Sequence, residues 1–248
     1  MSAKRLLILG GTTEASALVR RLGSETARFH TILSFAGRTA IPHVPNCEVR
    51  IGGFGGATGL SHYLRDADVD AVIDATHPFA ARMRWNVAEA CAERNLPRLR
   101  LERGPWRQQA GDLWQLVPDM DQASAALVWS QRIFLTIGRQ DLAAFSGYEH
   151  KWFLIRAIEK PDLDPPLPGE LLLARGPFTV EDEIELINVW RIDTIVSKNS
   201  GGGATEAKIT AARRLGIKVV MVERPPNPAG PLVETVAEAH DWLDQLAS

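Results

Sequence analysis

The stretch Leu6-Leu-Ile-Leu-Gly10-Gly11-Thr12-Thr13-Glu14-Ala15 joins four apolar residues to a glycine pair and then to polar, helix-forming residues. An apolar run without polar alternation is typical of a strand that is covered on both faces, as in a parallel sheet. The glycines allow a tight turn, and a threonine can cap the helix that follows. The stretch therefore predicts a strand, a glycine turn and a helix, the opening unit of an α/β fold.

Short apolar runs alternate with longer amphipathic stretches along the rest of the chain, which predicts βαβ units and parallel sheets. The alternation occurs twice, on either side of a more polar segment at 102–111. We therefore expect two Rossmann-like α/β domains with mainly parallel sheets and a cleft between them, at residues 1–103 and 104–248. The last predicted helix, Thr235–Leu246, could also pack back onto the first domain. The predicted strands are Arg5–Leu9, His30–Ser34, Cys47–Ile51, Ala71–Asp74, Arg98–Leu101, Arg132–Ile137, Trp152–Ile158, Leu171–Ala174, Thr194–Ser197 and Lys218–Val222.

The composition describes an ordinary globular protein. The chain has 248 residues, of which 45% are hydrophobic and 23% charged, which excludes a disordered chain and a coiled-coil rod. Its formal net charge of −2 argues against a sequence-independent nucleic-acid binder, because such proteins are usually basic.

The two cysteines, Cys47 and Cys91, lie far apart and fit neither a disulfide framework nor zinc-ligand spacing. The apolar run Leu6–Leu9 is too short for the core of a signal peptide. No window approaches the roughly 20 apolar residues of a membrane span. We therefore expect a cytoplasmic protein with reduced thiols and no membrane contact.

The first glycine turn is a candidate phosphate site. Backbone N–H groups at a helix N-terminus are unsatisfied and the helix dipole is positive there, so a diphosphate binds well. The glycine pattern of dinucleotide-binding folds is matched only at Gly10, and Ala15 stands where the third glycine would be. A plain βα turn with a threonine cap explains the same residues.

The end of the second predicted strand bears on the choice of dinucleotide. Folds that bind NAD usually place an acidic residue there, roughly 20 residues after the glycines, for the ribose hydroxyl. Here the position holds Ser34, and Gly37-Arg38 follows. A hydroxyl and a guanidinium suit a 2′-phosphate, which predicts NADP. An ordinary loop arginine is the alternative interpretation.

A further strand-to-helix turn carries the residues Asp74-Ala-Thr76-His77-Pro78-Phe79-Ala80. Ligands of open α/β sheets bind at the carboxyl ends of strands, and Pro78 suits the first turn of a helix. His77 could contact a nicotinamide or a substrate, but a lone histidine is also a common structural residue.

The second half offers a cradle for an anion. A strand, a glycine turn and a helix are predicted over the stretch Ser197-Lys198-Asn199-Ser200-Gly201-Gly202-Gly203-Ala204-Thr205. Lys208 adds a second cation. Gly138-Arg139 and Arg175 follow two other predicted strands. A parallel sheet would bring these groups to one edge and make a cationic cleft for an acidic small ligand. A flexible loop and solvated arginines are the alternatives.

Several reaction types lack their motifs in this sequence. Neither Tyr63 nor Tyr148 has a lysine four residues later, as short-chain dehydrogenases require. There is no HExxH and no Gly-x-Ser-x-Gly. The sequence therefore offers neither a metal centre nor a covalent nucleophile.

As an ordered set that spans nearly the whole chain, these segments resemble the precorrin-6A reductase family of cobalamin biosynthesis. The matching pieces are Ile8–Ala15, Asp74–Ala80, Arg103–Trp106, Ile137–Arg139, Arg175–Phe178, Ser197–Gly202 with Lys208, and Val222–Pro225. The resemblance implies a two-domain enzyme that uses NADPH to reduce one double bond of the precorrin-6A macrocycle, which gives precorrin-6B. It also implies that the dinucleotide lies between the domains, with its phosphates at the first glycine turn.

Residues 1–103 are then the NADP-binding domain, and residues 104–248 complete the cleft for cofactor and substrate. Cofactor contacts are expected at Gly10, Gly11, Thr12, Thr13, Glu14, Ser34, Arg38, Thr76, His77, Pro78 and Phe79. Contacts with the polycarboxylate substrate are expected at Gly138, Arg139, Arg175, Lys198, Asn199, Ser200, Gly201, Gly202, Thr205 and Lys208. Lys198 and His77 are the candidate catalytic residues. Water, Lys198 and His77 all remain open as the proton donor.

Two alternatives stay open at this point. The anaerobic branch of the family reduces cobalt-precorrin-6A, and the sequence alone hardly separates the branches. A non-catalytic NADP-binding sensor would also have the glycine turns, but it would leave the basic residues of the second half unexplained. Transient contact with neighbouring enzymes of the pathway is a further expectation.

The Ser34–Arg38 assignment predicts the effect of Arg38→Ala. Loss of the guanidinium should raise the Michaelis constant for NADPH by about tenfold or more and leave that for NADH nearly unchanged, because only NADPH carries the 2′-phosphate. Initial-rate kinetics with both nucleotides measure this. An equal effect on the two would contradict the assignment.

Overall fold

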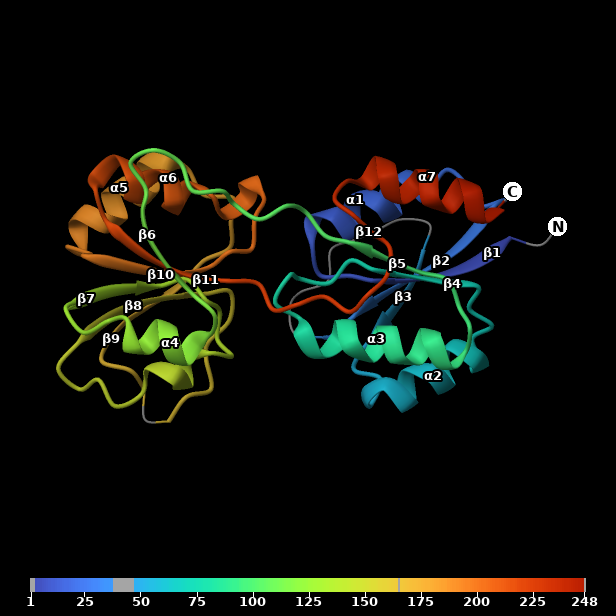
Figure 1. Cartoon of the computed structure of the whole chain (residues 1–248), viewed down its shortest axis with the longest axis horizontal. Helices are drawn as coiled ribbons and strands as arrows, with labels where there is room; N and C mark the ends of the chain where they lie inside the picture. Colours follow the sequence, from blue (N-terminus) through green and yellow to red (C-terminus); the bar gives the residue numbers. More distant parts are fainter. Residues whose placement is uncertain (1–2, 38–46, 165, 248) are drawn as a thin grey trace. The chain divides into compact units, whose positions relative to one another are not determined.

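The computed structural model describes residues 3–37, 47–164 and 166–247. The chain forms two compact units, each with one six-stranded sheet, and every strand pairing is parallel (Figure 1). Unit 1 contains Met1–Gly104 and Pro225–Ser248, and unit 2 contains Pro105–Arg224. The predicted α/β class with parallel sheets is confirmed in both units.

The sheet of unit 1 has the strand order β12-β5-β4-β1-β2-β3. Its strands are β1 (Lys4–Leu9), β2 (Phe29–Phe35), β3 (Glu48–Ile51), β4 (Ala71–Asp74), β5 (Arg98–Leu101) and β12 (Leu232–Val233). The helices α1 (Thr13–Leu22) and α7 (Val236–Ala247) cover one face (Figure 1). The helices α2 (Gly56–Asp66) and α3 (Ala81–Glu93) cover the other.

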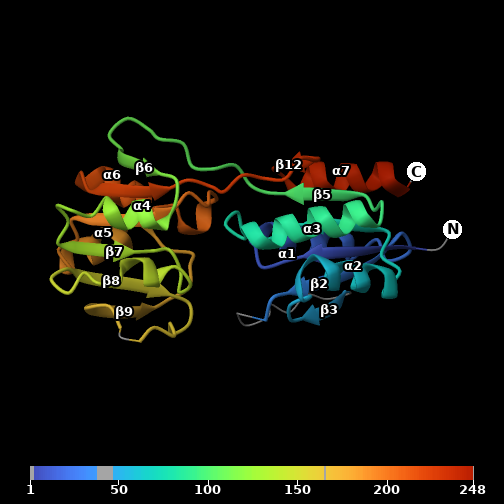
Figure 2. The same ribbon diagram turned by 60° about the horizontal axis from the view of Figure 1, so that its bottom comes forward.

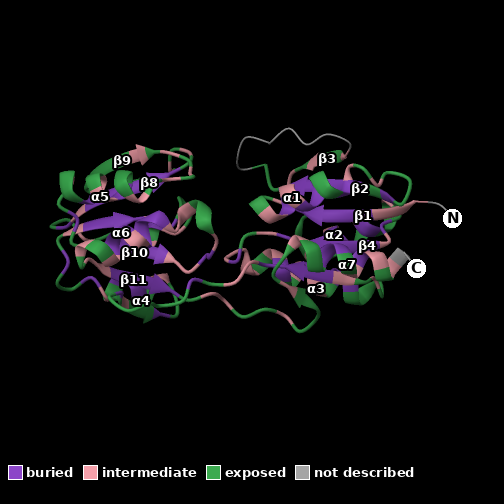
Figure 3. Cartoon of the chain, turned by 90° about the horizontal axis from the view of Figure 1, so that it is seen from above, coloured by how far each residue is buried: buried purple, intermediate pink, exposed green. Residues whose placement is uncertain are grey.

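The apolar run that opens the chain lies at the centre of this sheet, as its composition predicts. Leu6 and Ile8 pack in the core under α1 and α7. Leu7 and Leu9 pack in the core under α2 and α3. A strand buried on both faces has no polar side, which is why the run shows no alternation. Figure 3 shows the same burial along the central strands of both units.

The sheet of unit 2 has the strand order β6-β11-β10-β7-β8-β9. Its strands are β6 (Leu113–Val117), β7 (Arg132–Leu135), β8 (Trp152–Ala157), β9 (Gly169–Leu173), β10 (Thr194–Lys198) and β11 (Lys218–Val222). One face carries α5 (Val180–Val189) and α6 (Ala207–Leu215), and the other carries α4 (Met120–Ala125) and the 3₁₀ turn η1 (Leu142–Phe145) (Figure 2). A second 3₁₀ turn, η2 (Gly203–Thr205), precedes α6.

Two strands of the structure are absent from the sequence prediction, and both are edge strands. Most residues of β6 are exposed or half-buried, and β12 has only two residues, so neither shows a buried apolar run. The segment from Pro225 onward belongs to unit 1 and not to the expected second domain of residues 104–248, in agreement with the alternative that the last helix packs onto the first domain. The reason is that β12 pairs with β5 and α7 packs on α1.

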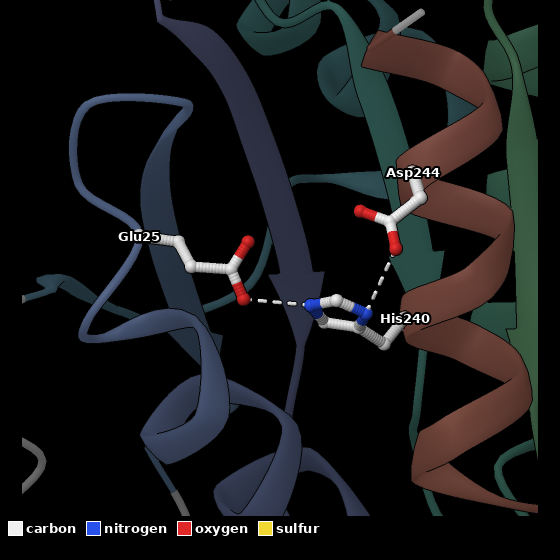
Figure 4. Close-up of side chains that lie close together, drawn as sticks. All are labelled: Glu25, His240 and Asp244. Carbon is white, nitrogen blue, oxygen red and sulfur yellow. Dashed lines mark hydrogen bonds and ion pairs between the residues drawn. The ribbon is translucent and has the colours of Figure 1, made fainter.

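Ion pairs fasten α7 to the loop between α1 and β2. His240 lies between two carboxylates, with Nε2 2.6 Å from Glu25 and Nδ1 3.3 Å from Asp244 (Figure 4). Arg28 binds both carboxylates at 2.7 Å. The three acidic and histidine groups lie close enough to suggest a cation site. However, the carboxylates approach different ring nitrogens of His240, so the arrangement is an ion-pair cluster.

None of the helices within the described part of the chain has the length and apolar character needed to cross a membrane.

The packing of α7 predicts the effect of Leu243→Ala. Leu243 is fully buried in the core with α1, so its truncation should lower the free energy of unfolding of unit 1 by about 2–4 kcal/mol. Urea denaturation followed by circular dichroism measures this. The exposed neighbour Gln245 supplies the control, because Gln245→Ala should change the stability by less than about 0.5 kcal/mol. Equal effects of the two variants would show that α7 is not part of the core.

Candidate active site

The first glycine turn connects β1 to α1 and is shaped by close packing. A Cβ on Gly10 would lie 2.8 Å from the Leu33 side chain of β2, so a larger residue there would force that buried side chain to shift. Gly11 has a φ of +111°, and a Cβ built on it meets nothing within 4 Å. Open space beside the N-terminus of α1 therefore fits a group that approaches the backbone closely, as a diphosphate does.

Thr12 fixes this turn and is not available to a ligand through its hydroxyl. Its Oγ1 donates to the carbonyl of Ala75 at 2.8 Å and accepts from the N–H of Ala15 at 3.2 Å. The predicted threonine cap of α1 is thereby confirmed. The hydroxyl also ties the turn after β1 to the end of the neighbouring strand β4.

Glu14 lies in the first turn of α1, and its carboxylate binds Arg103 at 2.8 Å. Both side chains are about four-fifths buried, at 18% and 19% exposed. The ion pair balances a negative charge that would otherwise repel a phosphate at this helix end. Arg103 is therefore a candidate site residue that the spacing did not indicate, although it lies in one of the segments that carry the family resemblance.

At the end of β2, Ser34 is buried and accepts a hydrogen bond from Arg50 at 3.3 Å. Arg50 also donates to the carbonyls of Gly52 and Gly53 and stacks on Phe54, with its guanidinium carbon 3.7 Å from the ring centroid. Arg38 lies outside the described residues. The described cation nearest the hydroxyl is thus Arg50 of β3, which the sequence reading did not single out because strand adjacency is not visible along the chain.

The turn after β4 rests on a buried ionic network. Arg100 binds Asp74 at 2.7 Å and Glu102 at 2.5 Å, and these side chains are at most 5% exposed. Arg100 also donates to the hydroxyl and the carbonyl of Thr76 at 3.0 and 3.1 Å. Thr76 in turn donates from its hydroxyl to Asp74 at 2.7 Å. Thr76 is thus a bound part of the framework rather than an available ligand group.

Arg84 of α3 joins this network from the other side. It binds Glu102 at 3.3 Å, and its guanidinium donates to the carbonyl of Pro78. It also donates to the carbonyl of Pro225 at 3.0 Å, where the chain re-enters unit 1. The two arginines therefore fix the loop between β4 and α3 by its backbone.

His77 is exposed in this loop, between Thr76 and Pro78, whose carbonyls the two arginines bind. Its Nδ1 accepts from the N–H of Phe79 at 3.2 Å, so in the neutral ring the proton lies on Nε2. The imidazole can then donate from Nε2 to a ligand. Phe79 lies beside it, with ring centroids 6.0 Å apart.

In unit 2 the structure brings Lys198 together with an acidic residue that the sequence reading missed. Lys198 ends β10, and its Nζ lies 2.5 Å from the carboxylate of Asp141. Asp141 follows β7, which is the strand next to β10 in the sheet. The lysine is 18% exposed and the aspartate 33%. The pair therefore presents a directed ammonium group at the carboxyl edge of the sheet.

The glycine turn after Lys198 is anchored by Trp106 and Asn199. The Asn199 side chain accepts from the N–H of Trp106 at 2.8 Å and donates to its carbonyl at 3.2 Å. The indole of Trp106 donates to the carbonyl of Gly202 at 3.1 Å. Gly201 and Gly202 have φ values of +66° and +78°, which favour glycine.

Arg224, at the end of unit 2, completes this anchoring. It donates to the carbonyls of Asn199 and Ser200 at 2.8 and 3.0 Å. Gly203 and Ala204, further along the turn, are exposed. The turn is thus a held loop and not a flexible one, which answers the alternative interpretation.

The remaining predicted substrate contacts fall into two groups. Arg139 and Arg175 lie on the surface; Arg139 is 38% exposed and pairs with Glu159 at 3.1 Å. Gly138 has a φ of +79°, and nothing lies near a Cβ built there. Lys208 differs, because it is only 3% exposed and its ammonium binds the carbonyl of Thr205. The expected direct contact of Lys208 with a ligand therefore does not fit its burial.

Known proteins similar to this chain indicate its family. The family described as "Precorrin-6x reductase CbiJ/CobK" matches residues 5–244. A precorrin-6A reductase of Rhodococcus erythropolis is 49% identical over 244 residues, which are 98% of both chains. The chain belongs to the precorrin-6A reductase family. A solved structure named "CobK precorrin-6A reductase" is 44% identical, with a TM-score of 0.90 over 98% of this chain and 97% of that one.

Within the family, the degree of similarity differs between the two kinds of reductase. A cobalt-precorrin-6A reductase of Priestia megaterium is 27% identical over 98% of this chain. The segments quoted above for the resemblance lie at the carboxyl ends of strands or just after them in both units. The segments that carry the resemblance therefore lie at the same edges as the candidate site.

The buried network under the β4 turn predicts the effect of Glu102→Gln. The substitution leaves two buried guanidinium groups with less negative charge, so it should lower the free energy of unfolding by about 3–5 kcal/mol. Urea denaturation measures this. Glu48→Gln is the control, because Glu48 is 50% exposed where it pairs with His30, and removal of its charge should cost less than about 1 kcal/mol. A loss no larger than in the control would show that the network does not hold the turn.

Proposed function

We propose that this chain catalyses the NADPH-dependent reduction of one double bond of precorrin-6A, which gives precorrin-6B in cobalamin biosynthesis. The observation that carries the proposal is the 49% identity to a precorrin-6A reductase over 98% of both chains. The lower identity of 27% to a cobalt-precorrin-6A reductase favours the metal-free substrate.

The residues of unit 1 fit a dinucleotide. Gly11 leaves the N-terminus of α1 open to phosphate groups, next to the closely packed Gly10, and Arg103 neutralises Glu14 beside it. Ser34 and Arg50 supply a hydroxyl and a guanidinium at the end of β2, and Arg38 is proposed from the sequence to join them around a 2′-phosphate. His77 and Phe79 present a donor and a ring at the end of β4. When bound, NADPH supplies the hydride.

The chemistry that remains for the protein is binding, orientation and proton supply. Reduction of a carbon–carbon double bond adds a hydride to one carbon and a proton to its neighbour. Asp141 accepts a hydrogen bond from Lys198 and so fixes the direction of the ammonium group. Lys198 then either holds a substrate carboxylate or delivers the proton, and His77 and water are the other candidate donors.

The cationic groups of unit 2 suit a substrate that carries many carboxylates. Arg175 is exposed, and Arg139 is bound to Glu159 only at the half-exposed surface, where a carboxylate can compete for it. The N–H groups of Asn199 and Ser200 bind carbonyls within the fold, so the Gly202–Thr205 part of the turn is where backbone donors would add hydrogen-bonding groups without adding bulk. These features favour an enzyme over a sensor that binds only the nucleotide, because a sensor gives unit 2 no acidic ligand.

Two wider expectations accompany this function. We propose a cytoplasmic location, which is consistent with Cys91 as a buried thiol whose pKa burial raises to about 12. We also propose transient contact with neighbouring enzymes of the pathway, since they supply the substrate and consume the product.

The direct test is the oxidation of NADPH on addition of precorrin-6A, and the decisive variant is Lys198→Ala. Its turnover or substrate affinity should fall by at least about tenfold, because a directed charge at the site is lost. Asp141→Asn should lower the rate in the same direction, since it removes the group that orients Lys198.

Lys218→Ala is the matched control. Lys218 begins β11, so it lies at the amino ends of the strands, whereas Lys198 lies at the carboxyl ends. Its ammonium binds the carbonyl of Ala126. Its kinetic constants should stay within about twofold of wild type. Unchanged kinetics of Lys198→Ala would remove Lys198 from the site, and a wild-type protein that does not oxidise NADPH with precorrin-6A would contradict the proposed function.

A further inference from the structure

The glycine turn of unit 2 is held from its inner side by donors that bind its carbonyl oxygens. Arg224 and Trp106 bind the carbonyls in its first half, as described above. Lys208 binds the last one, with its Nζ 2.7 Å from the carbonyl oxygen of Thr205. Because the N–H of a peptide points away from its C=O, these contacts also set the direction of the backbone donors of the turn.

Lys208 acts on the turn by two routes. It binds Thr205 directly, and its ammonium lies 4.8 Å from the ring centroid of Trp106, the residue whose indole binds Gly202. A cation above an aromatic ring is attracted to it, so the lysine also holds the indole in place. The lysine is 3% exposed, so a ligand at the surface of the turn cannot reach it.

Charged groups face Lys208 from two neighbouring elements. Arg156 of β8 and Glu183 of α5 form a buried ion pair at 2.7 Å, and both lie close enough to act on the lysine charge. Arg156 also stacks between Phe134 and Phe178, with its guanidinium carbon 4.7 and 3.9 Å from their ring centroids. The lysine therefore lies buried beside aromatic rings and a neutralised ion pair.

We propose that Lys208 is a positioning residue: its ammonium holds the Gly202–Thr205 part of the turn in the shape that binds the substrate carboxylates, and it does not touch them. The inference rests on the proposed function for the identity of the anion. For the shape of the turn it rests only on the contacts above.

The charge on this lysine changes near neutral pH. Burial, together with the positive charge of Arg156 and against the opposing charge of Glu183, lowers its pKa to about 7. A charged donor binds a carbonyl more strongly than a neutral amine does, so the hydrogen bond from Lys208 to the Thr205 carbonyl weakens as the pH rises above 7. By linkage, an anion that needs the held turn binds more tightly below this pKa and favours uptake of a proton.

The first test concerns the turn itself and needs no substrate. Nuclear magnetic resonance of the full chain follows the backbone amides of Gly203 and Glu206, which share peptide bonds with Gly202 and Thr205. In the wild type, both amides should shift between about pH 6 and pH 8 with one midpoint near the lysine pKa. In Lys208→Arg, which keeps a charge throughout this range, the step should disappear. Amides that shift equally in the variant would overturn the proposal.

The second test is kinetic. For the wild type, the Michaelis constant for precorrin-6A should rise above pH 7, whereas Lys208→Arg should show no such step. Lys208→Met removes the charge at similar length, so it should raise this constant by about tenfold at pH 6.5 and change the turnover number much less. A wild-type Michaelis constant in Lys208→Met would overturn the proposal.

Lys151 provides the matched control. It is also 3% exposed, and its ammonium binds the carbonyls of Leu127 and Ser130. It directly precedes β8, however, and so lies at the amino ends of the strands, away from the glycine turn. Lys151→Met should leave the Michaelis constant and its pH dependence as in the wild type, even where it lowers the melting temperature. If both methionine variants raised the Michaelis constant alike, Lys208 would be a structural residue only. A wild type without precorrin-6A reduction would refute the proposed function, while the amide titration would still decide the role of Lys208.

Discussion

Parallel pairing of the strands is the constraint on which the rest of the structure depends. In each unit it places the carboxyl ends of all strands at one edge, and the strand-to-helix turns follow there. The edge of unit 1 gathers the Gly10 and Thr76 turns, although they are far apart in sequence. The edge of unit 2 gathers Asp141, Lys198 and the glycine turn in the same way. Chemistry is therefore assembled by strand order and not by sequence proximity.

This assembly needs turns with a fixed shape, and charged side chains that are buried or half-buried fix them. Under the β4 turn, two arginines bind backbone carbonyls while Asp74 and Glu102 balance their charge. Under the unit 2 turn, Arg224 and Lys208 bind carbonyls in a comparable way. Removing a charged group from water costs free energy, and apolar side chains of similar size at these positions would often give an equally or more stable protein. That these charged groups are nevertheless present is consistent with turns whose shape matters for a ligand.

The sequence sufficed for those features that depend on neighbours along the chain. The β1 run, the threonine cap of α1 and the glycine turns follow from local rules, and all appear in the structure. Features that depend on strand order could not be obtained this way. Asp141 and Arg50 lie beside the predicted site residues because β7 lies beside β10 and β3 beside β2. Strands β6 and β12 escaped notice because edge strands lack the buried apolar run that signals a central strand.

Lys208 illustrates a different limit. Its place two residues into α6 suggested a cation for the anion cradle, and only its burial shows that the ammonium faces Thr205 and Trp106. Spacing along a helix gives the residue's position, but whether a long side chain reaches outward or inward depends on the packing around it.

Direct hydride transfer from NADPH to precorrin-6A is the reaction proposed for this chain. The most direct measurement is mass spectrometry of the product after reaction with NADPH that carries deuterium at the transferred position. The account predicts a reduced macrocycle that holds one deuterium from the nucleotide and one hydrogen from water. A reduced product without deuterium, or no reduction of the macrocycle at all, would contradict it.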